Sequence, residues 1–242
     1  MVITSKSNPL IKEIAKLSDK KYRREYGEYL VEGVKPVNEC LAAGCAVKKI
    51  VCTERLKENY PDAVIVSDGV FGTISEEKSP QGVIAVVELP QSLIEPPQGP
   101  CILLDRLQDP GNLGTIIRTA NAAGYKEIYL AGCTDAYSPK AVRASMSGIF
   151  FTKVYQGSLE EMLEALKGVP LICADMDGED IFDFAPPERF CLCIGNEGSG
   201  ISDKLMAAAN HKIKIPMEKT CESLNAAVSA GIAMYVLKKA QK

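Results

Sequence analysis

The chain has little of what metal sites and nucleophilic triads commonly use. Its 242 residues include one histidine, His211, and nine cysteines that contain no C-x-x-C pair. A metal site is therefore disfavoured, and we expect no metal. The single histidine also excludes most serine–histidine and cysteine–histidine chemistry unless His211 itself serves. We interpret His211 as a surface residue ahead of the strand HKIKIP, and the cysteines as buried, reduced thiols.

Long apolar runs are missing as well. No stretch approaches the roughly 18–20 apolar residues of a membrane span, so we expect no integral membrane protein and no membrane partner. The first residues, MVITSKSNPLIKEIAK, lack the apolar core and small-residue cleavage site of a secretory signal. The expected location is the cytoplasm. A hydrophobic content of 46% with 24% charged residues is typical of a globular protein, and the length allows one large domain or two small ones.

Charge is distributed unevenly along the chain. The formal net charge is −3, yet residues 1–50 contain ten basic and six acidic side chains. The densest basic stretch is KLSDKKYRREY, residues 16–26, where Lys20, Lys21, Arg23 and Arg24 alternate with tyrosines. Basic groups beside aromatic rings suit phosphate contacts and base stacking, which predicts RNA binding. The alternative is a solvated helix face with ordinary ion pairs.

A proline-rich stretch, ELPQSLIEPPQGP at 88–100, divides the chain. Proline fixes φ and removes a donor, so we expect an extended connector there. Before it, the pattern predicts helices over NPLIKEIAKLSD and KPVNECLAAG, together with the short strands YLVEG, KKIVCT, AVIVS and VIAVVEL. This half is predicted to be a small α/β domain with a basic helical entrance.

After the connector, apolar strands alternate regularly with helices. The expected strands are CILLD, EIYLAG, FTKVYQ, PLICAD, FCLCIG and KIKIP, and the last helix covers SLNAAVSAGIAMYVLKKA. One helix is predicted over 112–124, with Asn112 as its N-cap and Gly124 as its stop. This alternation favours a mainly parallel sheet covered on both faces. Ligands of such sheets bind beyond the carboxyl ends of the strands, so the loops there are candidates for the site.

Three of these loops have unusual composition. The first, DRLQDPGNLGTIIRTANAAGY, places Arg118 among apolar residues, as either a buried structural ion pair or a functional group facing a ligand. The second, IGNEGSGIS, allows close backbone approach and contains Glu197, a carboxylate that can orient an arginine or accept a proton. The third, KIPMEKTCESLNAAVSAGIAMYVL, has Ser223 and Asn225 where a helix of small residues begins, and either residue could simply cap it.

Together these stretches resemble the SpoU family, the TrmH-like RNA 2′-O-ribose methyltransferases. DPGNLGTIIRTANAAGY is similar to the first motif of the family, IGNEGSGIS to the second, and IPM followed by SLNAAVSAGIAMY to the third. Residues 3–88 also resemble the substrate-binding domain that often precedes the catalytic domain. The resemblance thus divides the chain into a ribosomal-protein-like RNA-binding domain (1–90), a linker (91–99) and a catalytic domain (100–242).

The resemblance implies several further properties. The catalytic domain would form an α/β trefoil knot, bind S-adenosylmethionine as methyl donor and assemble as a homodimer. By position, Gly195, Ile215 and Leu224 match the cofactor-binding residues of the family. Asn112, Arg118, Glu197, Ser223 and Asn225 match its polar active-site residues. The N-terminal domain favours ribosomal RNA, most of all 23S rRNA, over transfer RNA.

Methyl transfer to a ribose hydroxyl needs alignment, removal of a proton and exclusion of water, but no metal. Arg118 is commonly given the role of base in this family, yet a guanidinium with a pKa above about 12 rarely releases its proton. Holding the hydroxyl and its phosphate suits it better, with Glu197 or the RNA phosphate as proton acceptor. The alternatives are a tRNA 2′-O-methyltransferase, a base methyltransferase and a non-catalytic RNA-binding module. Nucleotide hydrolysis is disfavoured because the glycine-rich loop lacks a terminal Lys and Ser or Thr.

Overall fold

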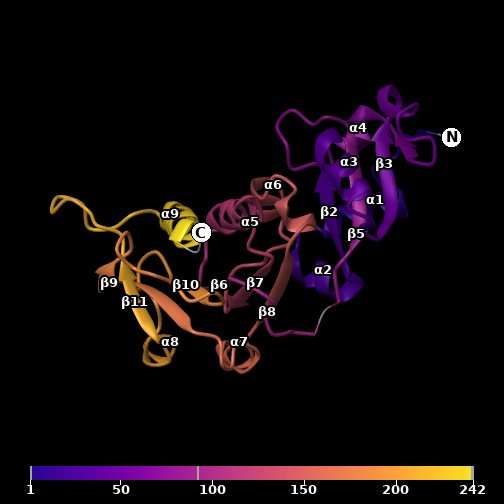
Figure 1. The fold of residues 1–242 in the computed structure, drawn as a ribbon. Coiled ribbons are helices and arrows are strands. Elements are labelled where there is room, and N and C mark those ends of the chain that lie inside the picture. The colour runs from indigo at the N-terminus through magenta and orange to yellow at the C-terminus, as the bar shows by residue number, and fades with distance from the viewer. Residues whose placement is uncertain (1, 92, 241–242) are drawn as a thin grey trace.

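The computed structural model describes residues 2–91 and 93–240, which form two α/β parts lying side by side (Figure 1). Met1, Ser92, Gln241 and Lys242, which belong to the predicted domains and linker, lie outside the described residues. No helix or strand occurs among the described residues between Glu88 and Cys101. No helix of the described chain is both long and apolar enough to cross a bilayer.

The first part is built on a mixed five-stranded sheet in the order β1-β4-β3-β5-β2. Its strands are β1 (Val2–Ile3), β2 (Glu28–Glu32), β3 (Val47–Thr53), β4 (Val64–Val66) and β5 (Val83–Glu88). Its helices are α1 (Pro9–Lys16), α2 (Lys20–Tyr26), α3 (Val34–Ala42), α4 (Asp68–Phe71) and the 3-10 helix η1 (Glu54–Leu56). The α/β character predicted for this half is therefore observed.

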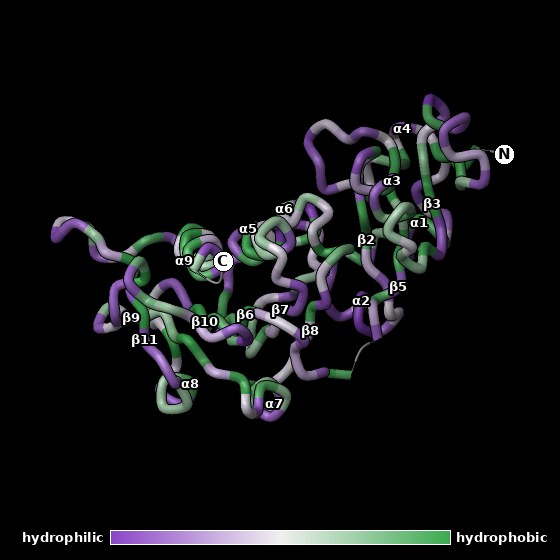
Figure 2. Tube along the Cα trace, viewed as in Figure 1, coloured by the Kyte–Doolittle hydropathy of each residue, from purple (hydrophilic) through white to green (hydrophobic). Residues whose placement is uncertain are grey.

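The basic stretch forms a helix of its own, whereas the sequence predicts a single helix over 8–19. The first helix ends at Lys16, and the Asp19 carboxylate accepts the backbone N–H of Lys21 at 2.8 Å to start α2. Gly27 then ends α2 in the left-handed conformation, with φ of 67°. Because Asp is a strong N-cap, the break at Asp19 turns the second helix in a new direction. Figure 2 shows α2 largely in the hydrophilic colour.

The second part contains a six-stranded sheet in the order β11-β9-β10-β6-β7-β8, and every neighbouring pair is parallel. Its strands are β6 (Cys101–Asp105), β7 (Glu127–Ala131), β8 (Lys153–Gly157), β9 (Leu171–Asp180), β10 (Cys191–Ile194) and β11 (His211–Lys214). Its helices are α5 (Pro110–Ala123), α6 (Pro139–Ala144), α7 (Leu159–Ala165), α8 (Asp203–Ala207), α9 (Ala226–Ala240) and the 3-10 helix η2 (Gly148–Phe150). The predicted parallel sheet is confirmed.

Helices cover both faces of this sheet, as the apolar strands predict. On one face, four fully buried thiols pack with Met162 of α7 and Leu205 of α8; they belong to Cys101, Cys173, Cys191 and Cys193. On the other face lie α5 and α9, which pack against each other (Figure 1). The interpretation of the cysteines as buried, reduced thiols is confirmed for these four and for Cys40 and Cys52, whereas Cys221 is exposed.

The start of α5 differs from the prediction, which makes Asn112 the N-cap. The cap is Asp109, whose carboxylate accepts the backbone N–H of Asn112 at 2.8 Å, and Pro110 is the first helical residue. Proline suits that position because its missing N–H would have no partner inside the helix. Asn112 therefore lies within the first turn, with its side chain free for other contacts. The predicted stop at Gly124 is confirmed, with φ of 85°.

An irregularity in β9 shapes the carboxyl edge of the sheet. Lys212 of β11 pairs with Cys173, but the next residue, Ile213, pairs with Glu179. Residues 174–178 therefore bulge out of the ladder. Gly178 returns the chain so close to β11 that a Cβ atom there would lie 2.5 Å from the backbone of Ile213. The strand predicted as PLICAD is thus longer than expected and carries a bulge where the ladder is interrupted.

A buried ion pair joins the two parts. Arg23 of α2 is 3% exposed, and its guanidinium donates to Asp135, in the loop after β7, at 2.7 and 3.0 Å. The same guanidinium also donates to the carbonyls of Leu17 and Ser18, both at 2.7 Å. Next to it, the rings of Tyr29 and Tyr137 lie 4.9 Å apart. The basic helix is thereby fixed against the second part.

Candidate active site

Polar residues from three separate loops meet at the carboxyl edge of the parallel sheet. The side-chain amide of Asn112 donates to Glu197 Oε1 at 2.8 Å. The amide of Asn225 in turn donates to Asn112 Oδ1 at 3.0 Å. Three residues predicted to be catalytic thus form one hydrogen-bonded chain, although Asn112 and Asn225 lie 113 positions apart in the sequence. We call it the Glu197–Asn112–Asn225 chain.

Helix starts hold two members of this chain in place. Asn112 is fixed through its backbone by Asp109, which also pairs with Lys140 at 2.8 Å. The Lys140 ammonium and the backbone N–H of Asn112 lower the pKa of Asp109, so its carboxylate stays charged. Asn225 uses its side-chain oxygen to accept the N–H groups of Ala227 and Val228 at the start of α9. The capping role expected for this position and its contact with Asn112 therefore occur together.

The loop that carries Glu197 is a tight turn. Asn196 and Gly200 exchange backbone hydrogen bonds of 3.0 and 2.9 Å across it. Gly195 is required at its start, because a Cβ atom there would lie 2.2 Å from the carbonyl carbon of Gly200. The glycine-rich composition therefore produces a closed turn that presents Glu197 to solvent. One oxygen of its carboxylate, Oε2, has no protein partner in the described part of the chain.

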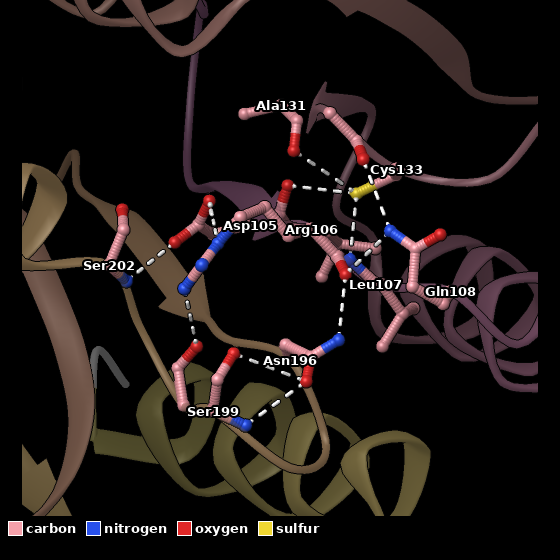
Figure 3. A network of polar contacts seen from close by, with 12 residues as sticks. Asp105, Arg106, Leu107, Gln108, Ala131, Cys133, Asn196, Ser199 and Ser202 are labelled. Carbon is pink, nitrogen blue, oxygen red and sulfur yellow. Dashed lines mark hydrogen bonds and ion pairs between the residues drawn. The ribbon is translucent and has the colours of Figure 1, made fainter.

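A second network fixes this loop to the end of β6, as Figure 3 shows. The buried Asp105 carboxylate accepts the N–H of Ser202 at 2.7 Å, and Asn196 donates to the carbonyl of Arg106 at 2.9 Å. Arg106 adopts a left-handed φ of 58° that turns its carbonyl toward Asn196. The thiol of Cys133 donates to the backbone carbonyl of Leu104 at 3.1 Å. Burial raises the pKa of the Cys133 thiol to about 12, so the thiol stays protonated and can donate this bond.

Several of these supporting residues were not predicted from the sequence, although signals exist. Asp109 precedes a proline, the same cap-and-proline pattern that identifies Ser138 and Pro139 at the start of α6. Asp105 is a charged residue at the end of an apolar strand, which is a signal for a buried, hydrogen-bonded carboxylate. Asn196 has no comparable signal, because its role depends on the conformation of the turn.

Arg118 does not join the Glu197–Asn112–Asn225 chain. Six residues after Asn112 on the same helix, it points about 120° away from it around the axis. Its side chain is exposed and makes no hydrogen bond or ion pair with any residue in 2–91 or 93–240. The alternative of a buried structural ion pair is therefore wrong. Its backbone packs closely on Gly148, where a Cβ atom would lie 3.0 Å from the Arg118 Cα.

An open cavity lies between the bulge of β9 and the segment after β11. Ile215, Leu224 and Ser223 line it, and so do Asp175, Met176 and Met217. It holds about 500 Å³ including its mouth, within the range of roughly 300–1,000 Å³ typical of ligand sites. Two of the predicted cofactor-binding residues and one predicted catalytic residue therefore share a cavity. Gly195 is not among its lining residues.

The basic stretch behaves differently at each of its predicted RNA contacts. Lys20, Lys21 and Arg24 are exposed. Arg23 is not, because it is buried and its guanidinium makes four hydrogen bonds, to Asp135 and to two carbonyls. We therefore remove Arg23 from the expected phosphate contacts and assign it to the junction between the two parts. Lys16, the last residue of α1, and Lys21 of α2 lie 5.0 and 5.5 Å from the centre of the Tyr22 ring.

Two family models match the chain, one over each part. Residues 99–235 match the model of the SpoU rRNA Methylase family, and residues 8–85 match the MRM3-like substrate binding domain. The chain belongs to the SpoU rRNA methylase family. The resemblance predicted from the three motifs is thereby confirmed, and the match includes the whole Glu197–Asn112–Asn225 chain.

Relatives align over nearly the full length. The chain is 32% identical to the 23S rRNA (guanosine(2553)-2′-O)-methyltransferase RlmP of Bacillus subtilis, with 98% of each chain covered. It is 30% identical to the 23S rRNA (uridine(2479)-2′-O)-methyltransferase of Streptomyces viridochromogenes, covering 96% of this chain and 90% of that one. The crystal structure of an AdoMet-bound rRNA methyltransferase from Sinorhizobium meliloti superposes with a TM-score of 0.91 and 30% identity, covering 99% of this chain and 97% of the other.

Proposed function

We propose that this protein transfers a methyl group from S-adenosylmethionine to a ribose 2′-hydroxyl of 23S ribosomal RNA. The observation that supports this most directly is the Glu197–Asn112–Asn225 chain, in which residues from all three SpoU motifs meet. The named activities of the full-length relatives support the same reaction and the same class of RNA. The two relatives act on different nucleotides, so the modified position is a property of each protein.

The cavity beside β9 and β11 fits the methyl donor by its chemistry. Ile215, Leu224 and Met217 offer apolar surface for the adenine ring, and the Asp175 carboxylate offers an acceptor for ribose hydroxyls or an ammonium group. S-Adenosylmethionine supplies an activated methyl group on a sulfonium, which a hydroxyl oxygen attacks in line. These residues bind and orient the donor and exclude water from it. Gly195 contributes by closing the neighbouring turn.

The protein's polar residues act on the RNA hydroxyl. The free Oε2 of Glu197 is an acceptor within the same chain as Asn112, and it suits removal of the hydroxyl proton as transfer proceeds. Arg118 donates to the hydroxyl and its neighbouring phosphate, which stabilises developing negative charge. Ser223 lies at the cavity and positions the RNA there. Lys20, Lys21 and Arg24 hold the RNA through phosphate contacts.

Three further properties follow from the family as proposals: a trefoil knot in the C-terminal segment, a homodimer and a cytoplasmic location. Exposed apolar residues on α9, Val228 and Tyr235, support a subunit contact on that helix. Arg118 points away from the Glu197–Asn112–Asn225 chain of its own subunit, which agrees with a site completed by assembly. Light scattering of the purified protein measures the subunit number directly.

The deciding experiment is transfer of labelled methyl groups to unmodified total RNA, with the RNA species separated and the nucleosides analysed. We expect label in 2′-O-methylnucleosides of 23S rRNA. Label in transfer RNA would favour the tRNA alternative, and label on a base would exclude ribose chemistry. Cofactor binding without transfer to any RNA or to ribosomal precursor particles would favour a non-catalytic RNA-binding module. Loss of transfer in Glu197→Gln ties the activity to this site.

A further inference from the structure

A second cavity lies at the junction of the two parts, away from the methyl-donor site. It holds about 800 Å³ including its mouth, and we call it the junction cleft. Its walls come from the end of β2, the start of α3 and the loop between α4 and β5 on one side, and from α6 and the turn after it on the other. Glu32, Lys35 and Glu77 line the first side, and Arg143, Met146 and Ser147 the second.

One polar group in the cleft has no partner in the protein. Ser147 is 5% exposed, and its hydroxyl makes no hydrogen bond with any described residue. The Ser147 oxygen is not among the fully buried atoms without a partner, which are Thr53 Oγ1 and Ser202 Oγ in the described chain, so it is open to the cleft. Ser147 lines both the cleft and a smaller cavity that adjoins it. The structure therefore presents a hydroxyl with free hydrogen-bonding capacity in the wall of the cleft, where a ligand can take the place of water.

The turn that carries this serine is strained and lies against the catalytic helix. Met146 and Ser147 both adopt left-handed φ values, 44° and 67°, which non-glycine residues rarely do. The next residue, Gly148, packs on the backbone of Arg118. The Met146 side chain is 53% exposed and lies at the cleft as an apolar surface. A ligand bound there would contact a turn that directly supports the helix of Arg118.

The charged residues that line the cleft indicate which chemical group of an RNA it can bind. Glu32, Glu39 and Glu77 face two cations, Lys35 and Arg143, and Arg143 pairs with Glu77 at 2.9 Å. This local excess of carboxylates does not suit a run of phosphates. It suits the edge of a base that presents N–H donors. The Glu32 oxygens accept one bond each from the protein, from Ser75 and from Glu76, and retain free acceptor positions.

We propose that the junction cleft binds an unstacked base of the RNA substrate, at a distance from the methylated nucleotide, and that guanine fits it best. Guanine presents adjacent N1–H and N2–H donors to a carboxylate such as Glu32, a ring face to Met146 and an acceptor to the Ser147 hydroxyl. The base belongs to a nucleotide other than the methylated one, because α5 lies between α6, which lines the cleft, and α9, which follows the segment that lines the methyl-donor cavity (Figure 1). This inference rests on the proposed function only for the identity of the ligand as 23S rRNA.

Cross-linking tests the proposal without requiring catalysis. Unmodified 23S rRNA transcripts containing 6-thioguanosine are irradiated with the full-length protein, and the cross-linked peptides are identified by mass spectrometry. We expect nucleotides attached to the peptide that contains Met146 and Ser147. Cross-links confined to α2, or to other surfaces outside the cleft, would overturn the proposal. Cross-links at the cleft in a protein that transfers no methyl group would reject the proposed function and keep the cleft as an RNA site.

Two variants give the test a quantitative form. Ser79→Trp places a ring in the mouth of the cleft from an exposed loop, and Ser147→Ala removes only the free hydroxyl. We expect affinity for the 23S transcript to fall at least tenfold in the first and about threefold in the second, a loss of roughly 1.4 and 0.7 kcal/mol. Affinity for S-adenosylmethionine should not change in either. Ala42→Trp, an exposed site at the opposite end of α3, is the matched control. RNA affinity within twofold of wild type in both cleft variants would contradict the proposal.

Discussion

Arg118 and Asn112 lie on the same helix, but the Asn112 side chain is hydrogen-bonded within the protein and the Arg118 side chain is not. Asn112 is held on both sides, by Glu197 and by Asn225. Arg118 is exposed and has no partner in the described structure, while its backbone is packed against Gly148. A guanidinium on a fixed backbone with free donors is suited to binding a phosphate and a hydroxyl that arrive with the RNA. The Arg118 guanidinium thus has no bond to the described structure, as the proposed contact with the substrate requires.

Replacing Arg118 should therefore affect transfer and leave cofactor binding intact. Loss of one preorganised donor to developing charge lowers rates by about 10²–10³-fold, so we expect Arg118→Ala to lose methyl transfer by at least that order. Binding of S-adenosylmethionine, measured by calorimetry, should stay within twofold. Arg118→Lys keeps the charge but not the planar pair of donors, and should recover little activity. A large loss of cofactor affinity in Arg118→Ala would contradict the assignment.

The Glu197–Asn112–Asn225 chain predicts coupled rather than independent effects. Asn112→Ala leaves Glu197 without its amide donor, and Glu197→Gln removes the charge that this donor holds. Groups in one network show interaction energies of about 0.5–3 kcal/mol, so the double variant should lose less transfer than the two single losses combined. Single-turnover methylation with saturating RNA measures this cycle. Strictly additive losses would mean that the hydrogen bond between the two side chains plays no part in the reaction.

Among the elements, the start of α5 supports the site through Asp109. The cap bond to Asn112 and the pair with Lys140 depend on a charged carboxylate, whose pKa is lowered in the folded protein. A lowered folded-state pKa means that the unfolded chain binds the proton more readily. The stability from this group is therefore present above its unfolded pKa of about 3.9 and is lost as pH falls through the folded value.

Asp109→Ala should accordingly destabilise the protein in a pH-dependent way. Loss of an N-cap costs about 0.5–2 kcal/mol, which we expect at neutral pH, with a smaller difference from wild type near pH 3. Urea unfolding at the two pH values measures it. Ser138→Ala, which removes the uncharged cap of α6, is the control and should show a cost that does not depend on pH in this way, because no acidic residue lies in the first turn of that helix. If Asp109→Ala lowered the free energy of unfolding more near pH 3 than at neutral pH, the stabilising role of the charged Asp109 carboxylate would be contradicted.

The same elements show what the sequence could and could not predict. Apolar strands and glycine stops determine the sheet and the ends of helices such as α5, because those signals act over a few neighbouring residues. The contact of Asn112 with Glu197 could not be derived from spacing, since it joins residues 85 positions apart. The motif resemblance placed both residues in one site, but only the fold shows them bonded. Arg23 was predicted wrongly for the same reason, because its partner Asp135 lies 112 positions away.

For the molecule as a whole, Arg23 and Arg24 give opposite expectations although they are neighbours. Arg23 is buried and holds α2 to the second part, so Arg23→Ala leaves Asp135 nearly buried and unpaired. Breaking a buried pair in this way costs about 3–5 kcal/mol, and we expect the free energy of unfolding to fall by that order. Arg24→Ala, at an exposed position, should change stability by at most about 0.5 kcal/mol.

RNA binding should show the reverse pattern. In the proposed function Arg24 contacts one RNA phosphate, so in Arg24→Ala affinity for 23S rRNA should fall and the slope of log affinity against log salt should decrease by about 1. Reversing the charge at Lys20, Lys21 and Arg24 together should weaken binding further. Filter binding across a salt series measures both effects. Unchanged affinity in the triple variant would return α2 to the alternative of a solvated helix face.

The cap of α9 has a consequence for the direction of hydrogen bonding across the site. Because the oxygen of Asn225 is committed to the first N–H groups of α9, its amide cannot rotate, and its N–H must point to Asn112. Asn112 then has only its own N–H to offer, which goes to Glu197. The donor-to-acceptor direction of the Glu197–Asn112–Asn225 chain is thus set by α9, and the last acceptor is the Glu197 carboxylate. Folding of the C-terminal segment therefore decides which atoms of the two amides face each other and that an N–H group, not an oxygen, faces Glu197.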